Sequence, residues 1–264
     1  TVLKGEKGIY RTPSFSPDGK WIVYRKEGGN NDQGHAFSKN PGIYIMSAEG
    51  GESRLVCRQG EYPVFSADGQ RIFFQTGGAY FGNLTKQYKS VDLHGHDERT
   101  HISSKYGNRF VLSPDNQWVA FQHLHKVYIA PLPETGKTID LADKSKSLPV
   151  QQVARDAGIN IHWSAKGDKV MWTLGNQYYS TELTERFTFL EGADKEVAPM
   201  PEKGIEIGLK VAGDKPEGSI VLKGARIITM EGEEVIDNGT IVIKENRIVA
   251  IGKASEVSIP EDAE

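Results

Sequence analysis

The stretch SFSPDGKWIVY, residues 14–24, decides the fold because it is the first of four similar stretches along the chain. The other three are VFSADGQRIFF at residues 64–74, VLSPDNQWVAF at 111–121 and HWSAKGDKVMW at 162–172. Their aligned serines lie 50, 47 and 51 residues apart. Four copies at a nearly constant spacing indicate a repeated structural unit of about 50 residues.

Each stretch places a tight turn between two apolar runs. Ser16, Pro17, Asp18 and Gly19 suit a type I turn, since proline fixes φ and glycine tolerates positive φ. A second apolar run follows each hairpin, and then a shorter outer strand such as residues 53–56. Four strands at this period are typical of one β-propeller blade. We therefore predict an all-β chain, a partial β-propeller of four-stranded blades with four repeats visible, plus a small C-terminal β segment.

Composition limits the classes of function. The 264 residues are 38 % hydrophobic, carry a net charge of -3 and contain no apolar run long enough for a spanning helix. We therefore expect neither a nucleic-acid partner nor a membrane partner. Cys57 is the single cysteine, so no internal disulfide can form. The chain begins with Thr1 and has no signal-type apolar core near it, so we expect a fragment whose targeting segment, if any, lies elsewhere.

The Ser-Pro-Asp-Gly repeat over residues 11–190 resembles the TolB-like branch of β-propellers, which is also found in tricorn-type and prolyl-oligopeptidase-type peptidases. TolB-like rings usually carry more than four blades, so the resemblance implies that further blades precede Thr1. TolB-like propellers joined to amidohydrolases are usually exported by bacteria. The resemblance therefore implies a periplasmic or secreted protein.

The spacing of the repeats stops after residue 190, and composition changes there. Residues 192–218 are rich in Pro, Glu, Lys and Gly, and residues 205–211 alternate as a half-buried strand does. We predict three segments: blades over residues 1–191, a linker with one strand over 192–218, and a second β segment over 219–264. The second segment should end in a hairpin at Glu245-Asn246, because asparagine tolerates the left-handed region.

The second segment resembles the opening of an amidohydrolase-superfamily enzyme, through IVLKGARIIT at 220–229, GTIVI at 239–243 and NRIVAIG at 246–252. In that family these strands begin a small β-sandwich that flanks a metal-dependent (β/α)₈ barrel. The resemblance implies a parent hydrolase of C–N or related non-peptide bonds that uses a divalent metal of the zinc type. The family's Pro-Gly-Leu-Ile-Asp-x-His-x-His run does not occur here, so we assign this chain no catalytic, cofactor-binding or metal-binding residue.

One face of the blades collects the candidate binding residues. The Ser-Pro-Asp-Gly turns and the outer turns lie on one face of a blade, so the remaining loops meet on the other face. His123 and His125 would lie on one side of their segment if it were extended. The glycine-rich loop 28–35 is either a binding loop or simply a solvated one. The candidate residues on this loop face are His35, Arg58, Glu61, Tyr80, Phe81, His123, His125 and Arg155.

His94-Gly95-His96, followed by Asp97, Glu98 and His101, has the composition of a metal site. The repeat alignment places this run where residues 45–51 form a hairpin in the first repeat. We therefore predict a solvated turn and no metal site.

Three functions remain in competition. The preferred one is the non-catalytic propeller portion of an amidohydrolase, acting as an accessory or substrate-gating domain with the missing catalytic domain as its partner. The alternative is a TolB-like module without enzymatic activity that binds a protein or peptide. The third, the propeller of a serine peptidase, expects an α/β-hydrolase sequence after the blades, and residues 220–252 are unlike one.

Overall fold

The structure, a computed structural model, describes residues 8–27, 40–78, 82–208, 210–213 and 217–264. Across these ranges the chain forms strands and turns and no helix, which confirms the predicted all-β class. Accordingly, the described residues include no helix capable of crossing a membrane. The chain divides into two compact units, Thr1–Ile207 and Gly208–Glu264.

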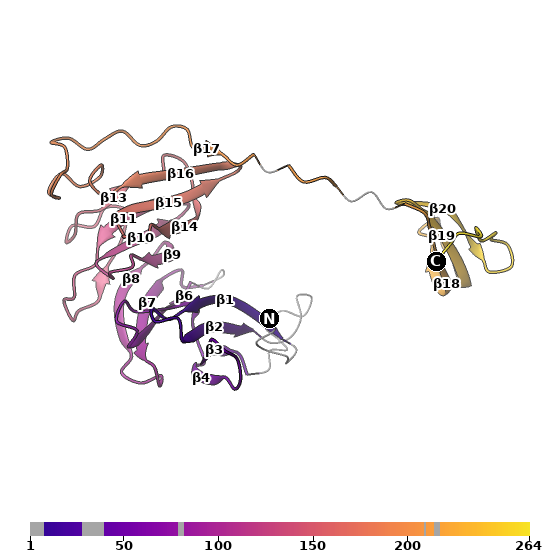
Figure 1. The fold of residues 1–264 in the computed structure, drawn as a ribbon, viewed down its shortest axis with the longest axis horizontal. Coiled ribbons are helices and arrows are strands. Elements are labelled where there is room, and N and C mark those ends of the chain that lie inside the picture. Colours follow the sequence, from indigo (N-terminus) through magenta and orange to yellow (C-terminus); the bar gives the residue numbers. More distant parts are fainter. Residues whose placement is uncertain (1–7, 28–39, 79–81, 209, 214–216) are drawn as a thin grey trace. The chain divides into compact units, whose positions relative to one another are not determined.

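Four sheets follow one another along the first unit, each with four antiparallel strands, and each begins at one of the four repeats (Figure 1). We call them blades 1 to 4. Blade 1 contains β1 (Ile9–Phe15), β2 (Trp21–Glu27), β3 (Gly42–Ser47) and β4 (Arg54–Cys57). Blade 2 contains β5 (Glu61–Phe65), β6 (Arg71–Gly77), β7 (Lys86–Asp92) and β8 (Arg99–Ser104).

Blades 3 and 4 have the same order of strands but shorter outer strands. Blade 3 contains β9 (Gly107–Leu112), β10 (Trp118–His123), β11 (Lys126–Pro131) and β13 (Gln151–Gln152). Blade 4 contains β14 (Ile159–Trp163), β15 (Lys169–Leu174), β16 (Gln177–Glu182) and β17 (Ile205–Glu206). The predicted partial β-propeller of four-stranded blades is confirmed, and its sheets form an open series.

The repeated turn has the predicted geometry. In the first copy the Gly19 N–H donates to the Ser16 carbonyl at 2.9 Å, and Gly19 has a φ of 72°. The Ser16 hydroxyl accepts the Trp21 N–H at 2.9 Å and donates to Asp18 at 2.6 Å. The side chain therefore closes the hairpin at the point where the second strand begins, which explains why serine and aspartate recur two residues apart.

Apolar layers join neighbouring blades, because each second and third strand presents β-branched and aromatic side chains to both faces of its sheet. Fully buried members of these layers are Val23, Ile43 and Ile72 between blades 1 and 2, Ile102, Phe110 and Phe121 between blades 2 and 3, and Ala120, Ile129 and Trp172 between blades 3 and 4. These three layers pack each blade against the next one along the first unit.

Blade 2 gains a fifth strand from the connection between β11 and β13. This strand, β12 (Ile139–Asp140), pairs in parallel with β8 through Ile139 opposite Ile102. The Leu141 N–H then donates to the Ser103 carbonyl at 2.9 Å, and the Leu141 side chain is 1 % exposed in the layer between blades 2 and 3. The sequence did not predict β12, since two residues are too few to show an alternating pattern.

The end of the first unit differs from the predicted linker. Residues 192–207 belong to the first unit, and the strand predicted over 205–211 is two residues long. It completes blade 4 by pairing with β16, with Ile205 opposite Tyr178. The buried Arg186 donates to the Pro199 carbonyl at 2.8 Å, so the proline-rich stretch packs on blade 4.

The second unit is a three-stranded antiparallel sheet of β18 (Ser219–Ile228), β19 (Val235–Lys244) and β20 (Arg247–Lys253). The hairpin between β19 and β20 lies at Glu245-Asn246, as predicted. However, its residue with positive φ is Glu245, at 58°, rather than Asn246. The C-terminal residues return to the sheet, where the Glu264 N–H donates to the Ser219 carbonyl at 3.0 Å.

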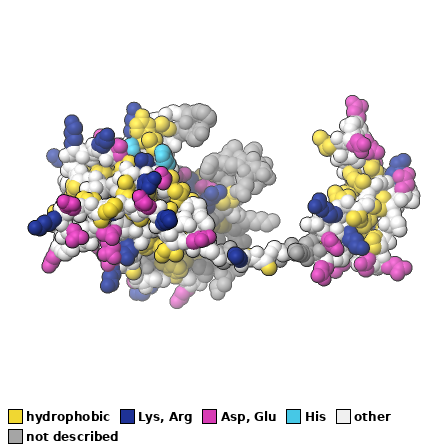
Figure 2. All heavy atoms as spheres, turned by 90° about the horizontal axis from the view of Figure 1, so that it is seen from above, with side chains coloured by type: hydrophobic (Ala, Val, Ile, Leu, Met, Phe, Trp, Pro, Cys, Tyr) yellow, Lys and Arg dark blue, Asp and Glu magenta, His cyan; other side chains and the backbone are white. Residues whose placement is uncertain are grey.

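The two faces of this sheet differ in exposure. Residues paired across strands share a face, so Ile220, Leu222, Ile241, Ile243 and Ile251 form one face, which we call the apolar face. Ile220, Leu222 and Ile251 are 48 %, 48 % and 44 % exposed, whereas Val242 on the opposite face is 1 % exposed. Figure 2 shows hydrophobic side chains gathered along this unit.

Candidate functional site

The predicted loop-face residues come from connections in several blades. His35, Tyr80 and Phe81 lie outside the described residues. Arg58 follows β4, and its carbonyl accepts a hydrogen bond from Arg25 Nη1 at 3.3 Å. Glu61 begins β5, with its Oε2 atom 3.9 Å from Lys86 Nζ. These contacts tie the loops to neighbouring strands and bring no reactive groups together.

Three loops of the predicted face do meet. The Leu124 N–H donates to the Tyr106 carbonyl at 2.9 Å, and the Gly158 N–H donates to the His125 carbonyl at 3.1 Å. The loops at 105–109, 123–125 and 155–160 are therefore neighbours, as the blade geometry predicts. Arg155 lies in the last of them and pairs with Glu202 at 3.5 Å, where both side chains are largely exposed.

The condition under which His123 and His125 would share a face, an extended segment, is not met. The segment is a tight turn in which His123 pairs with Lys126 and Leu124 has a φ of 57°. The His123 ring packs edge-on against Tyr128, with ring centroids 6.1 Å apart, whereas His125 is exposed. The alternation of an extended strand therefore does not apply to these two rings.

His94-Gly95-His96 forms the predicted turn, between β7 and β8. The Asp92 carboxylate accepts the N–H groups of His94 at 2.9 Å and His96 at 2.8 Å, and both imidazoles are exposed. These backbone hydrogen bonds, the one from His96 first, lower the pKa of Asp92. No group of three or more His, Cys, Asp or Glu residues in the described part of the chain could hold a metal ion.

A cavity of about 390 Å³ lies where the first strands of the blades converge. We call it the axial cavity. Phe15 of β1, Phe65 of β5, Leu112 of β9 and Trp163 of β14 line it. The Trp163 indole N–H donates to the Val111 carbonyl at 3.0 Å and thereby fixes the ring at this position. The cavity is suited to an apolar side chain.

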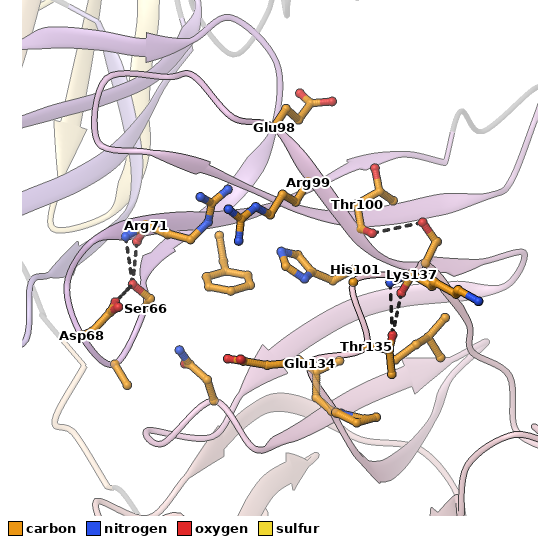
Figure 3. Close-up of a pocket in the computed structure, with 18 of the residues that line it drawn as sticks. Ser66, Asp68, Arg71, Glu98, Arg99, Thr100, His101, Glu134, Thr135 and Lys137 are labelled. Carbon is orange, nitrogen blue, oxygen red and sulfur yellow. Dashed lines mark hydrogen bonds between the residues drawn. The ribbon is translucent and has the colours of Figure 1, made fainter.

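A larger cavity of about 850 Å³ lies between blades 2 and 3 at the edge that carries the repeated turns (Figure 3). We call it the rim pocket. Arg71, Phe73, Arg99 and His101 from β6 and β8 form one wall, and the loop 132–138 forms the other. None of these residues was among the loop-face candidates, which lie on the opposite side of the blades, and the sequence analysis named His101 only in the run that it rejected as a metal site.

Arg71 and Arg99 share one carboxylate on the first wall. Asp97 Oδ2 lies 2.8 Å from Arg71 Nη1 and 2.6 Å from Arg99 Nη2, and these hydrogen bonds, the one from Arg99 first, lower the pKa of Asp97. Arg71 also donates from Nε to the Ser90 hydroxyl at 2.9 Å. Its side chain is 17 % exposed, against 59 % for Arg99. Arg71 is therefore fixed by the protein, while Arg99 has donors left for a ligand.

The hydrogen bonds around Ser90 assign the tautomer of His101. Ser90 Oγ lies 2.7 Å from His101 Nε2 and already accepts a hydrogen bond from Arg71. This buried hydroxyl forms no other hydrogen bond in which it could donate to a described residue, so its own proton goes to Nε2, and the neutral ring carries its hydrogen on Nδ1. Burial first, and then the charges of Arg71 and Arg99, lower the pKa of His101 to about 4, so the ring is neutral at pH 7.

Ser90 and His101 do not form a nucleophilic pair, although their distance suits one. Ser90 is 0 % exposed, so a substrate carbonyl has no access to its hydroxyl. His101 packs on Phe73 with ring centroids 4.9 Å apart. The hydrogen bond between Ser90 and His101 therefore has a structural role, because it fixes the orientation of the imidazole in the pocket wall. The group that the imidazole offers to a ligand is its Nδ1–H.

The opposite wall is anchored at both ends. The Leu132 N–H donates to the Gln117 carbonyl at 2.7 Å, and the Thr138 hydroxyl donates to the Thr100 carbonyl at 3.1 Å. Glu134 lines the pocket between these anchors (Figure 3). The rim pocket thus presents Arg99 and the His101 Nδ1–H on one wall and Glu134 on the other, with Glu98 and Lys137 also in its lining.

One signal in the sequence could have indicated this wall. The residue five positions after the repeat serine is Trp21 in the first copy and Trp118 in the third, but Arg71 in the second. The fourth copy has Lys169 at this position, so a cationic residue there distinguishes blades 2 and 4 from blades 1 and 3. The partners of Arg71 are Ser90 in β7 and Asp97 in the turn that follows, and spacing alone does not place them.

Comparison with known proteins gives structural likeness only. No family model and no curated protein matches the chain. The chain is similar to TolB from Acinetobacter baumannii at 20 % identity and a TM-score of 0.48, covering 68 % of this chain and 42 % of that one. It thus spans less than half the length of that TolB chain.

Two further solved structures are similar. The β-propeller domain of the Trilobed protease from Pyrococcus furiosus, described as having an open velcro topology, matches at 14 % identity and a TM-score of 0.42, covering 96 % of this chain and 74 % of that one. XC5397 from Xanthomonas campestris, a gluconolactonase, matches at 15 % identity and a TM-score of 0.46, covering 66 % and 58 % of the respective chains.

Proposed function

We propose that the chain is the propeller-bearing portion of a metal-dependent amidohydrolase, a hydrolase of C–N or related non-peptide bonds, in which the blades serve as an accessory or substrate-gating domain. The observation that carries the proposal is the apolar face of β18, β19 and β20. Three of its members are 44 % to 48 % exposed, and a sheet of this kind is stable when a second layer covers it. The opening strands of a β-sandwich have this property.

The divalent metal that the resemblance implies does not fit the described residues of this chain, which offer no cluster of three suitable ligands. We therefore assign the metal and the hydrolytic step to the barrel of the parent enzyme. The residues of this chain contribute binding surfaces and the framework of the first unit. A periplasmic or secreted location is part of the same proposal.

The test is the reading frame that encodes the parent protein. We expect a His-x-His run to follow Glu264 within a few tens of residues and to be succeeded by alternating strands and helices over roughly 250 residues. A frame that closes without such a run, or that continues into an α/β-hydrolase sequence, would overturn the proposal.

The alternative is a module that binds a protein or peptide without enzymatic activity. The axial cavity favours it, since an apolar cavity of about 390 Å³ lined by Phe15 and Trp163 suits one anchoring side chain of a partner. Under this alternative, Trp163→Ala would abolish retention of a partner by the immobilised chain. Under the preferred function, the same variant of the parent enzyme retains catalytic turnover and is altered in substrate access.

A further inference from the structure

We propose that the rim pocket binds the zwitterionic backbone of an amino acid or short peptide, with the carboxylate against Arg99 and His101 and the ammonium group against Glu134. This site lies on the blades themselves, so the inference does not depend on the proposed function. It concerns the described residues of blades 2 and 3.

The part of the site that would bind the carboxylate consists of hydrogen-bond donors that the described residues do not themselves use. Arg99 donates a single hydrogen bond, to Asp97, within the described part of the chain, and its side chain is 59 % exposed. No described residue is hydrogen bonded to His101 Nδ1, which carries a hydrogen in the assigned tautomer. An Arg guanidinium beside a neutral N–H donor matches the two oxygens of a carboxylate.

The position of these donors is fixed by packing and hydrogen bonds. Arg71 is held by Ser90 and Asp97, and it supports Asp97, which in turn orients Arg99. The His101 ring is held between the Ser90 hydroxyl and Phe73. Donors fixed in this way lose little conformational entropy when a ligand binds.

The ammonium half rests on Glu134. Its side chain forms no hydrogen bond or ion pair with any described residue, although it lines a pocket whose other wall carries two arginines. The loop that carries it is anchored at Leu132 and Thr138. A cavity of about 850 Å³ falls within the range of small-ligand sites and has room for a dipeptide.

The test is a titration of the full 264-residue chain, labelled with ¹⁵N-histidine, with the dipeptide L-alanyl-L-alanine. We expect the Nδ1 resonance of His101 to shift and to saturate by about 10 mM, as a millimolar Kd requires. The N-acetylated dipeptide and the dipeptide amide, which lack the ammonium and the carboxylate respectively, should each bind about tenfold more weakly.

Variants separate the two halves of the site. Arg99→Gln should weaken the free dipeptide about tenfold and remove its advantage over the amide, and Glu134→Gln should remove its advantage over the acetylated form. Arg226→Gln and Glu256→Gln in the second unit are the matched controls and should leave binding unchanged. Unchanged unfolding midpoints show that the variants fold.

Three results would overturn the inference. The first is no shift of the His101 resonances by the free dipeptide up to about 10 mM. The second is equal binding of the free and blocked dipeptides. The third is a spectrum in which the free protein carries the imidazole hydrogen on Nε2, because Nδ1 could then not donate to a carboxylate.

Discussion

The serine of each repeat stabilises its turn through its side chain. The Ser113 hydroxyl donates to Asp115 and accepts the Trp118 N–H at 2.9 Å, and the equivalent contacts recur at Ser16 and Ser66. In the fourth copy lysine occupies the aspartate position. Ser164 donates instead to Asp168, at 2.5 Å. The turn therefore requires a carboxylate near the serine but not at one fixed position.

Substitution of this serine should cost stability according to its burial. Ser113 is 1 % exposed, so Ser113→Ala leaves a buried Trp118 N–H without its acceptor, and we expect the free energy of unfolding to fall by about 1–2 kcal/mol. Ser164→Ala at the more exposed fourth turn is the matched control and should cost less than half as much. Urea unfolding of both variants measures the difference, and equal losses would contradict the role of burial.

The neutral state of His101 predicts a dependence of stability on pH. Its pKa is lowered from 6.5 to about 4 in the folded chain, so the unfolded chain binds the proton more readily. The free energy of unfolding should therefore fall as the pH drops from about 6.5 to about 4 and level off below that. Because the ring is partly exposed and screened by solvent, the loss is on the order of 1–2 kcal/mol.

His101→Gln tests this dependence, since glutamine does not titrate. Urea unfolding at pH 7 and at pH 4.5 should show a smaller fall for the variant than for the unaltered chain. If both chains lose the same stability over this interval, the titrating group is not His101.

At the scale of elements, the sequence predicted the hairpins that recur in every blade, but it did not predict the fifth strand of blade 2 or the length of the last strand of blade 4. The hairpins of all four blades follow from alternation and turn residues, which act locally. β12 and β17 are two residues long and exist because the surrounding chain brings them to a strand edge. The residue preferences of a short segment do not encode such pairings. The strand predicted over 205–211 was too long because alternation shows which residues could be extended, whereas only Ile205 and Glu206, of its described residues, find a partner in β16.

Substitution of Leu141 tests how much the fifth strand of blade 2 contributes to the stability of the fold. Its side chain is 1 % exposed between blades 2 and 3, so Leu141→Ala should lower the free energy of unfolding by about 2–4 kcal/mol. Leu124 is 60 % exposed, and Leu124→Ala is the control, with an expected change below about 0.5 kcal/mol. Similar midpoints in urea for the two variants would show that the layer between blades 2 and 3 does not depend on Leu141.

At the scale of the whole molecule, the exposed apolar face of the second unit predicts that the protein binds hydrophobic dyes and self-associates. Ile220→Thr with Ile251→Thr should reduce binding of a hydrophobic dye and self-association, and should not lower the unfolding midpoint of the first unit. Ile227→Thr is the control, because Ile227 is 7 % exposed and its replacement should destabilise the second unit. Unchanged dye binding in the double variant would contradict an accessible apolar face.

The candidate site was predicted less well than the fold. The blade geometry correctly placed the loops at 105–109, 123–125 and 155–160 together. The binding role of these loops, however, was predicted from their residue types alone. The rim pocket depends on Arg71, Asp97 and His101, which come from a strand, a turn and an outer strand. These three residues converge through the pairing of β6, β7 and β8 within one sheet, and the opposite wall comes from a loop of blade 3; the order of residues alone reveals neither.

The parallel pairing of β12 with β8 has a consequence for synthesis of the chain on the ribosome. β8 ends at Ser104, but the strand that covers its edge begins only at Ile139, after most of blade 3 has been translated. During that interval the unsatisfied edge of blade 2 is open to pairing with other nascent chains. Translation that pauses between these two points should therefore increase misassembly, and chaperones that shield sheet edges should be needed most at this stage.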